Sequence, residues 1–191
     1  MEEKKEVRNK ENKMKNINHI IAVYLTIAVV TMFAVVLLYT QVLINAYLPS
    51  ESMENTLMTG DRVIGNRLAY KLGKDPERFD IAIFHAPDDE GVLYIKRIIG
   101  LPGEKVTIKN GKVYINDGTE PLEDSFIKEK MEKEPDAEYN VPEGCYFMLG
   151  DNRNESLDSR FWDNPYVAKD KIVAKAVLKY WKGFKLIRSA G

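Results

Sequence analysis

The sequence predicts a mostly β protein in which a single N-terminal transmembrane helix precedes an antiparallel, barrel-like β domain. One observation is an uncharged, apolar run over residues 20–44, which exceeds the about 20 residues that a helix needs to cross a bilayer. The other is the pattern that follows, where short β-branched and aromatic segments alternate with turn residues, as in antiparallel sheets. A chain of 191 residues has room for this helix and one domain of ordinary size.

The N-terminal part is predicted to be a membrane anchor that starts in the cytoplasm. Residues 1–16 are highly charged and have few apolar groups, which indicates a solvated tail, and residues 17–45 form the anchor. Basic residues precede the anchor, whereas residues 45–61 contain none, so the positive-inside rule places the N-terminus in the cytoplasm. A cleaved secretory signal is the competing interpretation, but its apolar core would span only about 7 to 15 residues. We therefore expect a single-pass protein of the cell membrane.

Residues 46–191 are expected to form one β domain outside the cytoplasm. Its predicted strands are the segments 62–66, 80–85, 93–99, 105–109, 112–116, 145–149 and 171–181. Asn110-Gly111 predicts a two-residue hairpin turn, because both residues accept a positive φ. An acidic, proline-punctuated insertion at about 117–143 interrupts the domain, and we expect one helical turn within it near residues 126–131.

Charge and cysteine content exclude several classes of function. The net charge is −1, from 28 basic and 29 acidic residues, so no overall field attracts nucleic acid. Lysines and aromatic residues alternate over 179–185, but in a domain outside the cytoplasm we expect an amphipathic, membrane-proximal strand end there and no nucleic-acid partner. The single cysteine, Cys145, excludes an internal disulfide, and we expect it to be a small buried side chain. No metal-ligand spacing or nucleotide motif is present, so we expect no cofactor.

A serine close behind the predicted anchor is the first candidate for chemistry. Ser52 lies in the segment 49–53, and a serine becomes a nucleophile only when a neighbouring base takes its proton. The usual base is histidine, and the predicted β domain has one, His85. We expect His85 to lie at the surface end of a strand, which argues against a Ser-His-Asp triad.

Lys96 is the alternative base. In the predicted strand 93–99, alternation puts Lys96 on one face with Tyr94 and Ile98, and Arg97 on the other. One of these two basic side chains must then point into apolar surroundings. Burial would lower the lysine pKa from about 10.4, a value at which only about one molecule in a thousand is neutral near pH 7.5. The segment alone leaves open a solvated pair whose aliphatic stems lie along the surface.

A third segment, residues 150–160, gathers polar and charged groups directly after an apolar strand. Such density is also typical of an ordinary turn, because glycine, aspartate and asparagine are turn residues. By itself this segment therefore leaves open whether it is an ordinary turn or part of a functional site.

Taken together, the segments 49–57, 80–84, 94–104 and 150–160 resemble, in the same order, the signature motifs of bacterial type I signal peptidases. These enzymes are membrane-bound Ser/Lys proteases that remove signal peptides from exported proteins. The resemblance implies a serine endopeptidase whose partners are secreted preproteins and the lipid bilayer, with neither cofactor nor metal. Asn55 departs from the motif, which commonly has proline at that position.

The resemblance also implies roles for individual residues. Ser52 would be the nucleophile and Lys96 its general base, while Ser50 and the backbone N–H of Ser52 would form the oxyanion hole. Ser156 would orient the lysine amine, and Met53 would help to line the substrate site near the membrane.

Supporting ion pairs are implied as well. Asp158 and Arg160, together with Arg97, would form a network that holds the loop 150–160 against the lysine strand. The acidic insertion carries no signal of the family over residues 117–138.

Two other functions would use some of the same features. A repressor-type Ser/Lys autoprotease would cleave itself, but such proteins lack a membrane anchor. A membrane-tethered, non-catalytic β module would bind exported chains, and loss of Ser52 or Lys96 would have favoured that function.

Overall fold

The structure is a computed structural model that describes residues 1–71, 73–89, 91–132 and 136–189. The chain divides into two compact units, Met1–Val42 and Leu43–Gly191, and each is described by itself.

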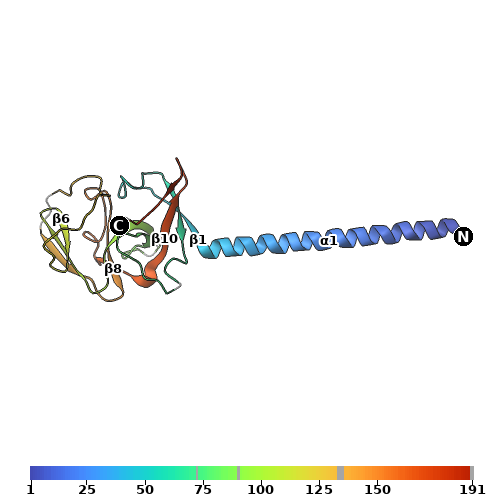
Figure 1. Ribbon diagram of the computed structural model, residues 1–191, viewed down its shortest axis with the longest axis horizontal. Helices are drawn as coiled ribbons and strands as arrows, with labels where there is room; N and C mark the ends of the chain where they lie inside the picture. Colours follow the sequence, from blue (N-terminus) through green and yellow to red (C-terminus); the bar gives the residue numbers. More distant parts are fainter. Residues whose placement is uncertain (72, 90, 133–135, 190–191) are drawn as a thin grey trace. The chain divides into compact units, whose positions relative to one another are not determined.

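The first unit is a single helix, α1 (Glu2–Val42), drawn in blue in Figure 1. Its stretch Lys4–Val42 is long and apolar enough to cross a membrane, and its large apolar side chains are exposed. The helix includes most of the predicted charged tail, where Glu6 and Lys10 form an i,i+4 ion pair of 3.3 Å, a spacing that supports helices. It ends three residues before the predicted end of the anchor at residue 45, because the chain there pairs as a strand.

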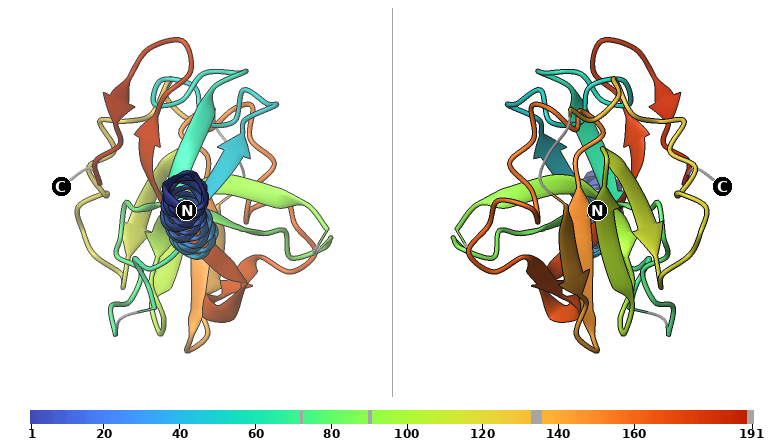
Figure 2. Two further views of the ribbon diagram at one scale, coloured as in Figure 1. Left: turned by 90° about the vertical axis from the view of Figure 1, so that its right-hand side faces the viewer. Right: turned by 90° about the vertical axis from the view of Figure 1, so that its left-hand side faces the viewer.

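The second unit is built on an antiparallel sheet that curls on itself (Figure 2). The order of its main path is β1-β2-β10-β3-β4-β8-β9, and β11 pairs with β10. The strands are β1 (Leu43–Tyr47), β2 (Arg62–Asn66), β3 (Ile81–His85), β4 (Leu93–Gly100), β8 (Cys145–Leu149), β9 (Tyr166–Ala168), β10 (Ile172–Lys179) and β11 (Lys185–Leu186). A short 3-10 helix, η1 (Lys169–Lys171), precedes β10. The mostly β, antiparallel, barrel-like architecture expected from the sequence is confirmed.

A smaller sheet has the order β6-β5-β7. Its strands are β5 (Lys105–Lys109), β6 (Lys112–Ile115) and β7 (Ala137–Asn140). Between β5 and β6, Asn110 and Gly111 have φ values of 50° and 72°, so the predicted hairpin turn is confirmed. The same sheet shows that the insertion is not all surface loop, because β7 lies within it.

All seven predicted strands are present, with ends that differ by no more than two residues. The strands that the sequence did not predict are β1, β7, β9 and β11. The residues of β1 continue the apolar run of the helix, so their composition gives no boundary, whereas the other three have only two to four residues and too few alternations to be recognised.

The helical turn predicted near residues 126–131 was wrong. Ile127 N donates to Asp124 O at 3.1 Å, which closes a turn, but no helix follows. The next backbone groups bond elsewhere in the domain: Lys128 N donates to Asp151 O at 3.0 Å, and Phe126 O accepts from the side chain of Asn55. Tertiary hydrogen bonds thus replace the local bonds that a helical turn would need.

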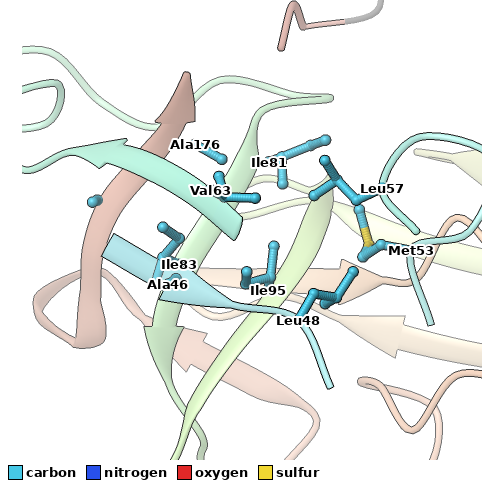
Figure 3. Close-up of a cluster of buried hydrophobic side chains, with 10 residues drawn as sticks. Ala46, Leu48, Met53, Leu57, Val63, Ile81, Ile83, Ile95 and Ala176 are labelled. Atoms are coloured by element: carbon cyan, nitrogen blue, oxygen red, sulfur yellow. The ribbon is translucent and has the colours of Figure 1, made fainter. Parts of the chain in front are cut away.

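Three buried apolar clusters stabilise the second unit. The first joins β1, β2, β3, β4 and β10 with a turn that follows β1; its buried members are Ala46, Leu48, Met53, Leu57, Val63, Ile81, Ile83, Ile95, Ala174 and Ala176. Figure 3 shows Met53 and Leu57 from the turn beside Ile81. This cluster holds the turn that carries Ser52 against the strand that carries Lys96.

Candidate active site

Ser52 lies in a compact turn between β1 and β2, which we call the serine turn (residues 50–57). Inside it, Leu57 N donates to Met53 O at 2.8 Å and Glu54 N donates to Glu51 O at 3.0 Å. The side chains of Met53 and Leu57 have no exposed area and fix the turn to the core. Met53, expected to line the substrate site, is therefore placed in the core by the structure.

The side chain of Lys96 reaches the serine turn from β4. Its Nζ atom is 2.5 Å from Ser52 Oγ, and the two residues are 5% and 3% exposed. Burial lowers the pKa of the amine to about 8, against the opposing effect of the carboxylates of Asp158 and Asp151. A large fraction of the Lys96 side chains is therefore neutral near pH 8 and able to accept the Ser52 proton.

Ser50 lies beside the same hydroxyl, with its Oγ atom 3.2 Å from Ser52 Oγ. Its side chain is exposed. The structure thus brings together Ser50, Ser52 and Lys96, as expected from the sequence.

The loop after β8 holds the serine turn through its backbone. Asn152 N donates to Ser52 O at 3.1 Å, and Asn152 Nδ2 donates to Glu51 O at 3.1 Å. These two bonds fix the peptide groups on both sides of the Ser52 Cα atom, one of which contains the Ser52 N–H. Asn152 was not among the residues predicted for the site, because a side-chain bond to a backbone carbonyl leaves no pattern in the sequence.

Arg97 pairs with Asp151, which corrects the expected ion-pair network. Its Nε and Nη2 atoms lie 2.8 and 2.6 Å from the two carboxylate oxygens of Asp151, and it also donates to Phe79 O at 2.8 Å. Arg160 pairs separately with Asp158, at 2.8 and 2.9 Å. The reason is the register of β4 and β8: Arg97 lies opposite Leu149, so the residue two positions later comes within its reach.

Asp158 and Arg160 stabilise the loop from within. Asp158 Oδ2 accepts a bond from Gly150 N at 3.0 Å, and Arg160 Nη2 donates to Arg153 O at 2.6 Å. Both side chains are almost fully buried, at 0% and 2% exposure. This pair therefore fixes the loop's conformation, while the Arg97 pair attaches the loop to β4.

Ser156 is buried next to the serine turn. A Cβ atom added to Gly150 would overlap with both Ser156 Oγ and Ser52 O, so these groups converge on one glycine. Within the described residues, the Ser156 hydroxyl has no hydrogen-bond partner. Its predicted contact with the lysine amine therefore remains a prediction.

A cavity of about 350 Å³ opens over Ser52 and Lys96. Its other lining residues are mostly apolar: Tyr47, Leu48, Pro49, Ser50, Val92, Leu93, Tyr94, Ile95, Glu155 and Leu157. Most of these residues come from two chain segments, 47–50 and 92–95. A buried amine, a hydroxyl and an apolar cavity are the parts that covalent acyl transfer requires.

His85 and Cys145 lie at a different place. Both line a separate cavity of about 360 Å³, and His85 is at the end of β3. Burial raises the pKa of the Cys145 thiol, which favours the unreactive protonated form. Neither residue lines the cavity that contains Ser52.

Comparison with known proteins gives a consistent set of matches. The family model "Signal peptidase, peptidase S26" matches residues 18–181. A "Probable signal peptidase I-2" of Synechocystis is 39% identical over 143 residues, which cover 71% of this chain and 62% of that relative. The signal peptidase I of Leptolyngbya laminosa is 39% identical over 145 residues, covering 71% of this chain and 67% of the relative.

Solved structures match as well, among them a signal peptidase I from Enterococcus faecalis. It is 33% identical, with a TM-score of 0.46, and the match covers 53% of this chain and 97% of that chain. With 62% of the Synechocystis protein covered, the chain spans less than two thirds of that relative's length.

Proposed function

We propose that this chain, which belongs to the signal peptidase family peptidase S26, is a membrane-anchored serine endopeptidase that removes signal peptides from exported preproteins. The observation that carries the proposal is the 2.5 Å contact between Lys96 Nζ and Ser52 Oγ at the base of an apolar cavity. Serine needs a base, and a lysine with a pKa of about 8 meets that need.

In the proposed mechanism, neutral Lys96 takes the proton of Ser52 as its Oγ attacks the scissile carbonyl. The developing oxyanion accepts hydrogen bonds from Ser50 and the backbone N–H of Ser52. Protonated Lys96 then gives its proton to the leaving amine, and the carbon–nitrogen bond breaks. A water molecule, deprotonated by the same amine, hydrolyses the acyl-enzyme and regenerates Ser52. The steps balance with no metal or cofactor.

The cavity suits a peptide bound in extended form. Segments 47–50 and 92–95 line the cavity and offer backbone groups for strand-like pairing. Small residues at the first and third positions before the cut are what the family implies.

The helix α1 supports the proposed placement in a membrane. It is long and apolar enough to span a bilayer, and the basic residues before its apolar stretch favour a cytoplasmic N-terminus. The Ser52 site would then act on the opposite side, where exported chains emerge.

A cleavage assay on the full chain, in detergent or liposomes, tests the proposal. The substrate is a preprotein with an Ala-x-Ala site, and the variants are Ser52→Ala and Lys96→Ala. We expect the native chain to cut at one bond, and each variant to be slower by about 10³-fold or more. Lys112→Ala, an exposed lysine on β6, is the matched control and should leave activity unchanged. Full activity of Lys96→Ala would refute the Ser/Lys pair, and an inactive native chain would favour the non-catalytic binding module.

A further inference from the structure

Residues 124–132 of the acidic insertion lie against both segments that hold Ser52 in place, and we call them the strap. The sequence gives this stretch no role, and it carries no family motif. In the structure, however, its contacts converge on the serine turn, on the loop after β8 and on Arg97.

The first group of contacts joins the strap to the serine turn. Asn55 Nδ2 donates to Phe126 O at 2.9 Å and to Ile127 O at 3.2 Å. Lys128 Nζ pairs with Glu54 Oε2 at 2.9 Å. Both contacts lie within three residues of Ser52.

The second group joins the strap to the loop after β8. Lys128 N donates to Asp151 O at 3.0 Å, and Asn154 both donates to Lys130 O at 3.1 Å and accepts from Glu132 N at 2.8 Å. Arg153 pairs with Asp124 at 3.0 Å, and its side chain is 1% exposed. The strap therefore bridges the two segments that enclose the nucleophile.

The third contact is aromatic. Phe126 is 9% exposed, and its ring lies 4.0 Å from the guanidinium carbon of Arg97, the residue next to Lys96. Cation–π contacts of this kind are stronger where water is excluded. The strap thus reaches the lysine strand as well as the serine turn.

Asn55 makes two of the strap's contacts with the serine turn, to Phe126 O and Ile127 O. Its φ is 88°, a left-handed conformation that asparagine tolerates and that proline cannot adopt, because its ring fixes φ near −65°. Asparagine at this position, where proline is common in the family motif, supplies a carboxamide that bonds to two strap carbonyls.

We propose that Asn55 is a positioning residue, which keeps Ser52 Oγ at the Lys96 amine by tying the serine turn to the strap. The proposal rests on the Ser/Lys mechanism, since it needs a reaction that depends on that contact. Reaction rates fall steeply when reacting groups are misplaced by an ångström, so loss of the tie should lower kcat and leave KM nearly unchanged.

The experiment compares Asn55→Gly with Asn110→Gly in the full chain. Glycine keeps the positive φ at both positions and removes the carboxamide, and Asn110, with φ 50°, lies in the remote β5–β6 turn. We expect Asn55→Gly to lower kcat about tenfold, with KM within twofold and the midpoint of the pH–rate profile unchanged. Asn110→Gly should keep kcat within twofold of the native chain.

A second variant and a second measurement make the test independent of catalysis. Asn55→Pro, which introduces the residue common in the motif, should lose more activity than Asn55→Gly. Hydrogen–deuterium exchange should show faster exchange over residues 51–57 in Asn55→Gly and no change there in Asn110→Gly. This measurement also separates a local loss of the tie from general unfolding, which would raise exchange throughout the domain.

The results that would overturn the proposal are distinct from those that refute the protease. If the native chain cleaves and Ser52→Ala does not, but Asn55→Gly has native kcat, the positioning role is wrong and the protease stands. An inactive native chain refutes the protease, and unchanged exchange over residues 51–57 in Asn55→Gly refutes the tie whatever the activity. Native activity in Asn55→Pro would likewise contradict it.

Discussion

Lys96 and Arg97 are neighbours on β4, are 5% and 1% exposed, and lie on opposite faces of the strand. The guanidinium of Arg97 donates to both carboxylate oxygens of Asp151. The amine of Lys96 instead donates to the hydroxyl of Ser52. Burial therefore has different consequences for the two cations. The ion pair compensates the buried charge of Arg97, while the pKa of Lys96 falls to about 8.

The first prediction concerns the pH dependence of cleavage. Only the neutral amine accepts the Ser52 proton, so with a Lys96 pKa of about 8 the rate should rise about tenfold per pH unit below that value and level off above it. Initial rates at saturating and at low substrate concentration, between pH 6 and pH 10, measure this profile. A rate that is independent of pH across this range would contradict the assignment of Lys96 as base.

The second prediction concerns stability. The pKa of Lys96 is lowered from 10.5 to about 8 on folding, so between these values the unfolded chain binds more protons and stability rises with pH. Below about pH 8 the buried charge of Lys96 lowers the free energy of unfolding by up to about 3 kcal/mol, relative to the neutral amine. Lys96→Met should therefore unfold at a higher temperature at pH 7, with a smaller gain at pH 10. Thermal unfolding in detergent measures both, and equal gains at the two pH values would show that burial of charge is not the cause.

The third prediction concerns the ion pair of Arg97 and Asp151, whose side chains are 2% and 0% exposed. Asp151→Asn leaves a buried cation without its counter-ion and should lower the free energy of unfolding by about 3 to 5 kcal/mol. The double variant Arg97→Met/Asp151→Leu should lose less than the sum of the single variants Arg97→Met and Asp151→Leu. Denaturant unfolding of the native chain, these two single variants and the double variant gives the coupling free energy, and strict additivity would show that the pair does not act as a unit.

The fourth prediction concerns Gly150. A methyl group here would overlap with Ser156 Oγ and Ser52 O, and because the second is a backbone atom the serine turn must move. Gly150→Ala should lower kcat by about tenfold or more, and unfolding should be easier by about 1 to 3 kcal/mol. Gly91→Ala is the control, since its new Cβ would lie 3.2 Å from the end of the Asp89 side chain in an exposed turn. Native kcat in Gly150→Ala would mean that the turn tolerates displacement.

The fifth prediction separates two roles of Ser156. Its buried hydroxyl has no partner within the described residues, so Ser156→Ala removes an uncompensated polar group and should not lower stability. If the hydroxyl orients the Lys96 amine during the reaction, kcat should nevertheless fall about tenfold. Melting temperature and kcat measured on the same sample distinguish the two effects, and unchanged kcat would exclude a role in catalysis.

Strand positions followed from local patterns, whereas chemistry made Ser52 and Lys96 candidates and the family resemblance assigned their roles. Alternating β-branched residues and an Asn-Gly turn act over a few residues, so they are visible in a sequence. Because a nucleophilic serine needs a base and no suitable histidine is expected, a lysine in an apolar strand becomes the candidate. The family motifs then connected two residues that lie 44 positions apart.

The choice of partners inside the site was not predictable in the same way. Arg97 has Asp151 and Asp158 as candidates in one loop, and only the register of β4 against β8 decides between them. The bond from Asn55 to Phe126 O has a backbone carbonyl as its acceptor. Because every residue has such a carbonyl, residue types do not reveal which one accepts the bond. Neither hydrophobic period nor residue type predicts these two contacts, because the contacts depend on how distant segments pack.

The position of β10 has a consequence for the order of events during synthesis. β2 and β3 do not pair with each other; each pairs with β10 (Ile172–Lys179), a strand that the ribosome makes well after both of them. The part of the sheet that adjoins the Ser52 turn and the part that carries Lys96 therefore lack their shared strand until β10 has emerged. Because pairing with this later strand is a long-range event that closes large loops, the contact between Ser52 and Lys96 should form only after residues 172–179 have been made.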